Sequence, residues 1–379
     1  MQIVSPSIPV KLDMQGHGLF YHPHARYIVS DYECMILSDR VPQAKWVISS
    51  FNPYERRYGG QCLDGKRVCI YRHTAFGDQL MISCLPRYIK TLFPSCYIGF
   101  YCSPEMLDMW RSNPFVDGGA LPLPIPFDVA RSYDYHIFFE GMLENNSEHD
   151  QNCCYDDFFG FAGLSNVPSE YKRPFIVPLP EDFGRVADIQ KFAHGSKYMV
   201  YHLAPANKNR CYPPDQGLDF IRMFLAINMD WKVVIVGKNS EDYLKGLPWS
   251  KIEGDPRIMN AVNKTGSFRD MIPLLEKASL LVCPDSSIMH LAACFPSCPT
   301  ISLWGLFHPH DRVAYYPNHH ALTAFGVCPK APCHNHEFTL PLHNCTKSEG
   351  WIDGDEYCAA LRAIRPEVIL KKAMEVIGK

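Results

Sequence analysis

Apolar residues in the first half of the chain fall into short runs that end at polar turns. Short continuous apolar runs of this kind are typical of buried strands, and they occur at 67–71, 96–102 and 133–139. Segments with helical spacing follow the first two runs, at 79–92 and 104–111. The pattern therefore predicts alternating strands and helices in this part of the chain.

The second half repeats the alternation more clearly. We expect strands at 197–203, 231–237, 279–283 and 299–304, and helices at 214–227, 240–247, 268–277 and 287–294. The end of the chain predicts an amphipathic helix with Pro366 in its first turn, where proline is favoured. Strands that alternate with helices indicate parallel sheets covered on both faces.

Chain length and local composition indicate how these elements are divided. With 379 residues the chain exceeds what one hydrophobic core usually holds. A Pro- and charge-rich stretch at 168–192 is the expected interdomain connection. The predicted fold is α/β, with an N-terminal extension or subdomain at 1–65, where no strong period is visible, and Rossmann-like domains at 66–190 and 191–379 that face a central cleft. The last helix could pack back on the first domain.

Composition narrows the partners and the compartment. The net charge of −3, without a dense Lys/Arg block, argues against broad contact with nucleic-acid phosphates. No stretch approaches the roughly 18–20 apolar residues that span a bilayer, and the N-terminus lacks the pattern of a secretory signal. The sixteen cysteines are scattered, and several, such as Cys69 and Cys283, lie inside apolar runs. We therefore expect a cytoplasmic protein with reduced thiols.

The first candidate for chemistry is the turn after the strand at 67–71. In open parallel sheets, ligands bind beyond the carboxyl ends of strands, and this strand ends in Arg72-His-Thr-Ala-Phe-Gly77-Asp78. Gly77 would allow a tight turn, and Asp78 then stands at a helix start, where a carboxylate is favoured. Asp78 either caps this helix or serves as a general base facing the cleft, with Arg72 and Gly77 shaping the turn or the acceptor side.

Basic residues follow another predicted strand end. Lys208 and Arg210 lie on the loop after His202. Two cations on such a loop suit a diphosphate, because arginine provides a fork of donors and lysine a point charge. The structural alternative is a solvated basic loop.

The third candidate is Asp285-Ser286-Ser287-Ile-Met-His290, between a buried strand and a helix. The free N–H groups of a helix start can bind an anion, and the two serines add hydroxyl donors. Asp285 can accept sugar hydroxyls, and His290 lies one helical turn beyond Ser286. As a bare motif, the run would also serve as an ordinary helix cap.

Together these segments resemble glycosyltransferase family nine, the heptosyltransferases. The run from Thr265 to Ala293 resembles the donor-site signature of that family, in which a loop, helix and strand lead to Asp-Thr/Ser-Gly/Ser-x-x-His-Leu-Ala-Ala. Gly77-Asp78 is similar to the family's Gly-Asp pair, and the loop after His202 resembles its His-Pro-Gly loop. The resemblance covers roughly residues 66–305. It implies the GT-B fold of two Rossmann-like domains.

The resemblance also implies an activity and site roles. The expected enzyme transfers a sugar from a nucleotide-diphosphate donor to an acceptor hydroxyl, inverts the anomeric centre, and needs neither metal nor cofactor. Asp78 would deprotonate the acceptor and Asp285 would contact the sugar. The remaining donor-binding positions are Ser286 and Ser287 at the diphosphate, His290 in the helix that follows them, Lys208 or Arg210 at the leaving group, Glu241 at the ribose, and Thr265, Gly266 and Ser267 at the base.

Departures from the family pattern keep several questions open. Ser287 stands where the family commonly has Gly, and residues 1–65 have no counterpart in the family core. The acceptor, whether a glycan, a lipid-linked compound or a nucleic acid, is therefore not defined. Three alternatives remain: a glycosyltransferase that acts on modified DNA bases, a sugar-nucleotide epimerase of the same fold, and a non-catalytic sugar-nucleotide binding protein.

A Cys- and His-rich segment near the end raises the question of zinc. It contains Cys328, Cys333, Cys345 and Cys358, with His334 and His336 among them. Zinc sites usually show tighter paired spacing. We therefore favour reduced cysteines over a structural zinc site.

Overall fold

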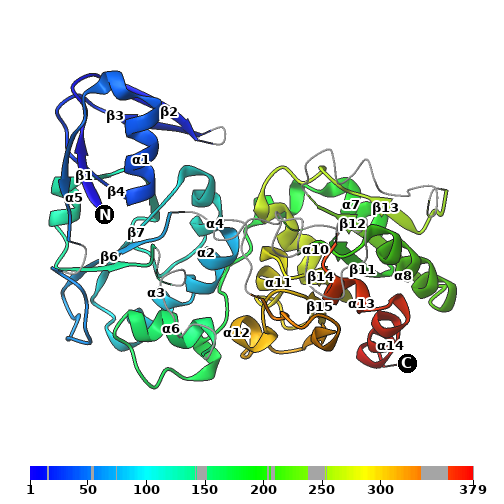
Figure 1. Ribbon diagram of the computed structural model, residues 1–379. Coiled ribbons are helices and arrows are strands. Elements are labelled where there is room, and N and C mark those ends of the chain that lie inside the picture. Colours follow the sequence, from blue (N-terminus) through cyan, green and yellow to red (C-terminus); the bar gives the residue numbers. More distant parts are fainter. Residues whose placement is uncertain are drawn as a thin grey trace. The chain divides into compact units, whose positions relative to one another are not determined.

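The computed structural model describes residues 1–14, 17–52, 55–73, 75–140, 142, 152–202, 205, 210–237, 252, 254–333 and 357–378. The chain forms two compact units, Met1–Val177 and Pro178–Lys379 (Figure 1). None of the helices that these residues form combines the length and the apolar character needed to cross a membrane.

The first unit contains a four-stranded parallel sheet in the order β10-β6-β7-β8. Its strands are β6 (Arg67–Tyr71), β7 (Tyr97–Cys102), β8 (Ala120–Pro122) and β10 (Tyr135–Phe138). The sheet is accompanied by α2 (Phe76–Ile82), α3 (Leu85–Leu92), α4 (Leu107–Trp110), α5 (Phe127–Arg131) and α6 (Cys154–Phe161). The three strands predicted from apolar runs are confirmed, because their side chains are buried on both faces of the sheet.

The helix expected at 79–92 is two helices. The break falls at Ser83–Cys84, between α2 and α3. Pro86 lies in the first turn of α3 and has no N–H to continue the bonding pattern of α2. The Ser83 hydroxyl instead donates to the Leu80 carbonyl at 2.6 Å and accepts from the amide of Phe175 at 2.7 Å.

Residues 1–65 are far more regular than their sequence suggested. They form α1 (Asp31–Arg40), a hairpin of β2 (Val10–Met14) and β3 (His17–Tyr21), and the strands β1 (Gln2–Ser5), β4 (Tyr27–Val29) and β5 (Val47–Ser50). An antiparallel sheet has the order β5-β1-β4-β9, in which β9 (Ile125–Pro126) comes from much later in the chain. No strong period was visible in the sequence of this region, because strands of three to five residues are too short to display one.

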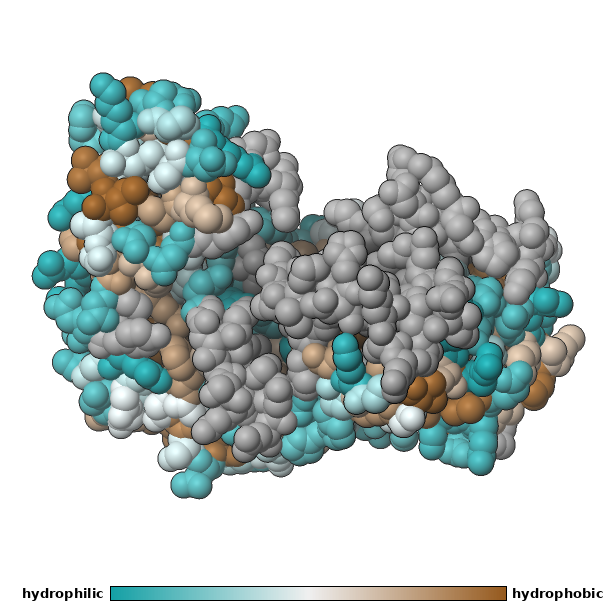
Figure 2. Space-filling view, viewed as in Figure 1, coloured by the Kyte–Doolittle hydropathy of each residue, from teal (hydrophilic) through white to brown (hydrophobic). Residues whose placement is uncertain are grey.

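This N-terminal sheet shares a core with the parallel sheet. Ile28 of β4 packs in one cluster with Cys69, Tyr71, Leu123 and Ile125, all of them buried. The outer surface of the first unit mixes polar side chains with apolar ones (Figure 2). Val47 in the edge strand β5 is the most exposed of its large apolar side chains, at 71%.

The second unit is a six-stranded parallel sheet in the order β13-β12-β11-β14-β15-β16. The strands are β11 (Lys197–His202), β12 (Trp231–Val236), β13 (Ile258–Asn260), β14 (Leu280–Pro284), β15 (Thr300–Trp304) and β16 (His319–Thr323). The helices are α7 (Ala187–Ala193), α8 (Pro214–Ile227), α10 (Ile272–Lys277), α11 (Ser287–Ala292), α12 (Pro309–Val313), α13 (Ala359–Ala363) and α14 (Pro366–Val376). The strands and helices predicted for this half are confirmed, apart from the helix at 240–247, which lies outside the described residues.

The two ends of this sheet were not predicted. The outer strands β13 and β16 are partly exposed and lack the continuous apolar runs of the inner strands. The final helix α14 packs on α8 and β15, within its own unit. Parallel sheets with helices between their strands make both units Rossmann-like, which is the fold class that the sequence predicted.

A buried ion pair joins the start of the second unit to the segment that precedes α10. Asp182, in a short 3₁₀ segment (Pro180–Gly184), receives two hydrogen bonds from Arg269 in another (Phe268–Met271), at 2.9 and 2.6 Å. Both side chains are fully buried. Burial favours the neutral acid, but the hydrogen bonds from Arg269 and from the Leu179 amide outweigh it and lower the pKa of Asp182.

Candidate active-site residues in the two units

In the first unit, Asp78 lies at the carboxyl edge of the parallel sheet. Strands β6 and β10 are adjacent, with Tyr71 opposite Phe138, so the segments that follow them begin at the same edge. Arg72 donates to the carbonyl of Phe139 at 2.9 Å and forms a buried ion pair with Asp78. This pairing holds the carboxylate of Asp78 at the edge where ligands of parallel sheets bind.

The turn that carries Asp78 differs in detail from the prediction. Asp78 is the third residue of α2 and not its N-cap, which is Ala75. Ala75 has a φ of 70°, a left-handed conformation that is strained for a residue with a Cβ. The tight turn expected at Gly77 therefore falls two residues earlier, and Gly77 lies within the first turn of the helix.

Two residues that the sequence did not single out fix this turn. Gln79, fully buried, donates to the carbonyls of Arg72 at 2.7 Å and His73 at 3.2 Å, and accepts from the indole of Trp110 at 2.6 Å. Glu140 accepts from the amide of His73 at 3.1 Å. No motif marks either residue, because Trp110 lies far from Gln79 in the sequence, as His73 does from Glu140.

In the second unit, three of the predicted donor residues lie after the ends of β11 and β14, which are neighbours in the sheet. His202 ends β11, and its Nδ1 lies 3.3 Å from the hydroxyl of Ser286. Burial lowers the pKa of His202 to about 4, so its imidazole is neutral near pH 7. Arg210 forms an ion pair with Asp285 at 3.7 Å. The geometry therefore brings together Arg210, Asp285 and Ser286.

The helix after Ser286 is short. α11 has six residues, and Ser286, its N-cap, uses its hydroxyl toward His202. No side chain of the described residues caps the first turn of α11. The amides of this turn and the Ser287 side chain, which is partly exposed, can therefore act as donors, but a short helix contributes only a small dipole.

His290 lies inside the unit and not on the open turn. It is 3% exposed, and its Nδ1 lies 2.5 Å from the hydroxyl of Tyr316. Burial, together with the nearby Arg312, His319 and Arg210, lowers its pKa well below the usual value. His290 is therefore a neutral side chain that anchors α11 to the segment carrying Tyr316, and its contact with a donor stays a prediction.

The loop expected at the nucleotide base is held by its own hydrogen bonds. The amides of Gly266 and Ser267 both donate to Asp270, at 2.6 and 3.0 Å. The Ser267 hydroxyl accepts from Arg185 at 3.0 Å. These bonds give Gly266 and Ser267 a structural role, while Thr265 is partly exposed and retains its side chain for a ligand.

Several predicted residues cannot be placed. Lys208 and Glu241 lie outside the described residues, as does Cys345 of the cysteine-rich segment. Cys328 and Cys333 are partly buried and Cys358 is buried. In the described part of the chain, no three His, Cys, Asp or Glu side chains are grouped so that they could hold a metal ion.

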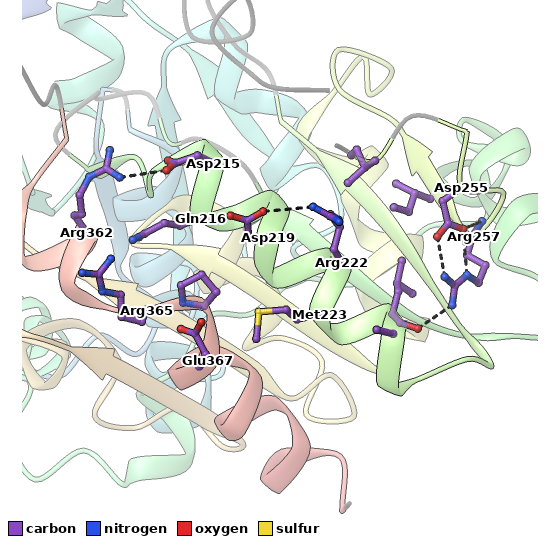
Figure 3. A pocket seen from close by; sticks show the side chains of 15 residues that line it. Asp215, Gln216, Asp219, Arg222, Met223, Asp255, Arg257, Arg362, Arg365 and Glu367 are labelled. Atoms are coloured by element: carbon purple, nitrogen blue, oxygen red, sulfur yellow. Dashed lines mark hydrogen bonds and ion pairs between the residues drawn. The ribbon is translucent and has the colours of Figure 1, made fainter. Parts of the chain in front are cut away.

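A groove of about 900 Å³ runs along α8, away from these residues (Figure 3). Its charges are largely matched: Asp215 pairs with Arg362 at 3.3 Å, and Asp255 with Arg257 at 2.7 Å. Asp285, Ser286 and Arg210 are not among its lining residues. The groove was not predicted from the sequence.

Solved structures share the fold of most of the chain. A family 9 glycosyl transferase from Veillonella parvula has a TM-score of 0.62 at 14% identity over 84% of this chain and 99% of its own. ADP-heptose LPS heptosyltransferase II of E. coli has a TM-score of 0.58 at 13% identity, over 82% and 98%. The dodecameric, iron-containing heptosyltransferase TibC, with bound ADP-D-beta-D-heptose, has a TM-score of 0.59 at 13% identity, over 88% and 82%. A sequence search of curated proteins finds no match.

The fold, with its two Rossmann-like units, is that of the GT-B glycosyltransferases. Residues 179–341 match the family model of glycosyltransferase family 9 (heptosyltransferase). The chain thus carries a glycosyltransferase family 9 domain and is a nucleotide-sugar-dependent glycosyltransferase.

Proposed function

We propose that this enzyme transfers a sugar from a nucleoside-diphosphate donor to an acceptor hydroxyl with inversion. The first unit supplies the base Asp78, and the second unit binds the donor. The observation that carries the proposal is the grouping of Arg210, Asp285 and Ser286 at the ends of two adjacent strands, within the segment that matches the family model.

Each group in this set has a chemical role in the transfer. The guanidinium of Arg210 faces the charge that develops on the leaving diphosphate, and the Ser287 hydroxyl and the amides of Ser286 and Ser287 donate to its oxygens. Asp285 accepts from the sugar hydroxyls. Lys208 and Glu241 complete the set as the resemblance implies, at the diphosphate and the ribose.

Asp78 has the position of a general base. Its carboxylate is held by Arg72 at the ligand-binding edge of the parallel sheet, and its side chain is 16% exposed, enough to meet an acceptor hydroxyl. In this role it takes the proton of the attacking hydroxyl as the nucleoside diphosphate leaves from the opposite face of the sugar.

ADP-heptose is the first donor to test, because it is bound in the TibC structure. Because Arg210 and the amides face the leaving group, we propose that transfer needs no divalent metal and proceeds undiminished in a chelator. The product nucleotide is ADP in this case, and its release provides the assay.

The variant Asp78→Asn separates the role of a general base from a role in donor binding. It keeps the size of the side chain, and we expect kcat to fall about 10²–10⁴-fold, which is typical for removal of a general base, while the Kd for ADP stays unchanged. Asp128→Asn, on an 89% exposed side chain of the same unit, is the control and should keep full activity. Weakened ADP binding with normal turnover would contradict the assignment. Conversion of the nucleotide sugar in the absence of any acceptor would instead indicate an epimerase.

A further inference from the structure

A buried side-chain amide connects the two sides of the turn that carries Asp78. This turn joins β6 to α2, and Gln79 follows Asp78 directly in α2. The Nε2 of Gln79 reaches back across the turn and donates to the carbonyls of Arg72 at 2.7 Å and His73 at 3.2 Å. These two hydrogen bonds fix the helix that carries Asp78 against the end of the strand.

Trp110 in α4 sets the orientation of this amide. Its indole Nε1 donates to the Oε1 of Gln79 at 2.6 Å. Because an indole N–H can only donate, the oxygen of the amide faces Trp110 and the nitrogen faces the two carbonyls. Trp110 is itself held by stacking on Phe100 of β7, with 3.6 Å between the ring centroids, and both rings are buried. Three hydrogen bonds therefore keep Gln79 in one orientation.

Arg72 connects Gln79 to the carboxylate of Asp78. The backbone carbonyl of Arg72 accepts from Gln79, while its guanidinium pairs with Asp78 and donates to the carbonyl of Phe139 at 2.9 Å. A shift of the Arg72 backbone would therefore move the guanidinium, and with it the carboxylate of Asp78. Gln79 acts on Asp78 in two ways, as the next residue of the helix and through Arg72.

The turn has a conformation that needs such support. Ala75, at its centre, has a φ of 70°, which is strained for a residue with a Cβ and persists only where the surrounding structure holds it. Among the described residues, no side chain caps the first turn of α2. Gln79 lies after Ala75 and bonds to two residues before it, so its amide holds the strained residue from both sides.

We propose, on the basis of the proposed glycosyltransferase function, that Gln79, oriented by Trp110, is a positioning residue that fixes the carboxylate of Asp78 for proton transfer. The side chain of Gln79 is fully buried, so it acts on turnover only through the groups that it holds. A misplacement of about 1 Å can cost roughly 10²-fold in rate. The effect of Gln79 on turnover therefore depends on the presence of the Asp78 carboxylate.

The test is a double-mutant cycle on the full chain. ADP-heptose is the donor, and the release of ADP is measured with water alone and with methyl glucoside as the acceptor. Hydrolysis and transfer both release ADP, whereas epimerisation does not. Gln79→Met, which keeps the length of the side chain without its hydrogen bonds, should lower kcat about 10- to 100-fold and leave the Kd for ADP unchanged. In an Asp78→Asn background, the same substitution should lower kcat by less than about twofold, because no base is left to position.

A second variant and a control separate positioning from stability. Trp110→Phe keeps an aromatic ring against Phe100 and removes the indole N–H, so we expect a smaller loss of kcat that also disappears in the Asp78→Asn background. His136→Phe removes a different buried hydrogen bond of the same unit, the one to the Ala130 carbonyl at 2.9 Å. It should lower the Tm and leave kcat unchanged.

The outcomes separate this inference from the proposed function. Equal losses of kcat from Gln79→Met with and without the Asp78 carboxylate overturn the inference, and so does an unchanged kcat in the folded Gln79→Met protein. If Gln79→Met does not fold, the cycle of Trp110→Phe with Asp78→Asn decides by the same criteria. A wild-type protein that releases no ADP with either acceptor, or an Asp78→Asn variant with full turnover, would instead overturn the proposed function, and this inference with it.

Discussion

Replacement of Arg269 by Met should destabilise the second unit strongly, because it leaves Asp182 buried without its partner. Both side chains are fully buried, and two hydrogen bonds of 2.9 and 2.6 Å join them. Breaking a buried ion pair from one side typically costs 3–5 kcal/mol. The direct Coulomb attraction at 2.6 Å is about 6 kcal/mol at an effective dielectric of 20. The desolvation cost of the two charges offsets part of this attraction, which is consistent with a loss of about 3–5 kcal/mol.

The expected shift in melting temperature follows from the size of the unit. A unit of about 200 residues has an unfolding entropy near 0.4 kcal/mol/K, so a loss of 3–5 kcal/mol lowers its Tm by about 7–12 °C. Scanning calorimetry of the full chain measures this change. Arg257→Met is the matched control, because its ion pair with Asp255 is 28% exposed on both sides and should contribute less than about 1 kcal/mol.

A second variant tests the physical reason. Adding Asp182→Asn to Arg269→Met removes the unpaired charge and should recover part of the lost stability. The pKa of Asp182 is lowered in the intact pair, so the pair's contribution is complete above pH 3.8 and is lost as the pH falls through the lower, folded-state pKa. In Arg269→Met, only the Leu179 amide and the charge of Arg185 still oppose the effect of burial on Asp182, so we expect the pKa of Asp182 to rise and the stability deficit of the variant relative to the wild type to shrink in acid. A Tm loss below about 2 °C, or a double variant less stable than the single one, would refute this account.

Three further predictions concern the second unit. Arg210→Ala should raise the Kd for ADP about tenfold or more, as seen by calorimetric titration, because a charged donor to the diphosphate is lost; unchanged affinity would remove Arg210 from the donor site. Burial lowers the pKa of His202 to about 4 and that of His319 to about 3. Below pH 6.5 the folded state therefore binds fewer protons than the unfolded state, and the free energy of unfolding should fall as the pH drops toward 4. In urea titrations, His202→Gln should reduce this slope by up to about 1.4 kcal/mol per pH unit, and an unchanged slope would contradict the neutral buried imidazole. Gly217→Ala should lower the Tm of the unit by several degrees, because its Cβ would lie 2.2 Å from the hydroxyl of the buried Tyr201, and a stabilised variant would show that Tyr201 moves freely.

The sequence predicted the inner strands well, because strands that are buried on both faces consist of continuous apolar residues. β6 and β14 are continuous apolar runs, and their positions follow from that alone. The strands β1 and β4 escaped notice, because their partners are distant in sequence and each strand is very short. Short strands of this kind form because they pair with distant strands, and the local sequence pattern contains no information about that pairing.

The sequence predicted the residue types of the candidate site, but not the ion pair and the hydrogen bond that join these residues. The motif around Asp285 pointed to its place after a strand, where the structure has it. The ion pair of Asp285 with Arg210 and the hydrogen bond of Ser286 to His202 depend on which strands are neighbours. Glu140 was overlooked because a single acidic residue after a strand carries no signal until the adjacent strand is known.

The pairing of β4 with β9 ties the beginning of the protein to its middle. Ile28 stands opposite Ile125, so the first sheet cannot be completed during synthesis until about a hundred further residues have left the ribosome. Until then, β4 has no β9 to pair with, and its apolar side chains remain uncovered. A shortened gene that starts at residue 66 would leave Ile125 and Leu123 uncovered, and we expect its product to aggregate, so the first fifty residues are better regarded as an integral layer than as a removable appendage.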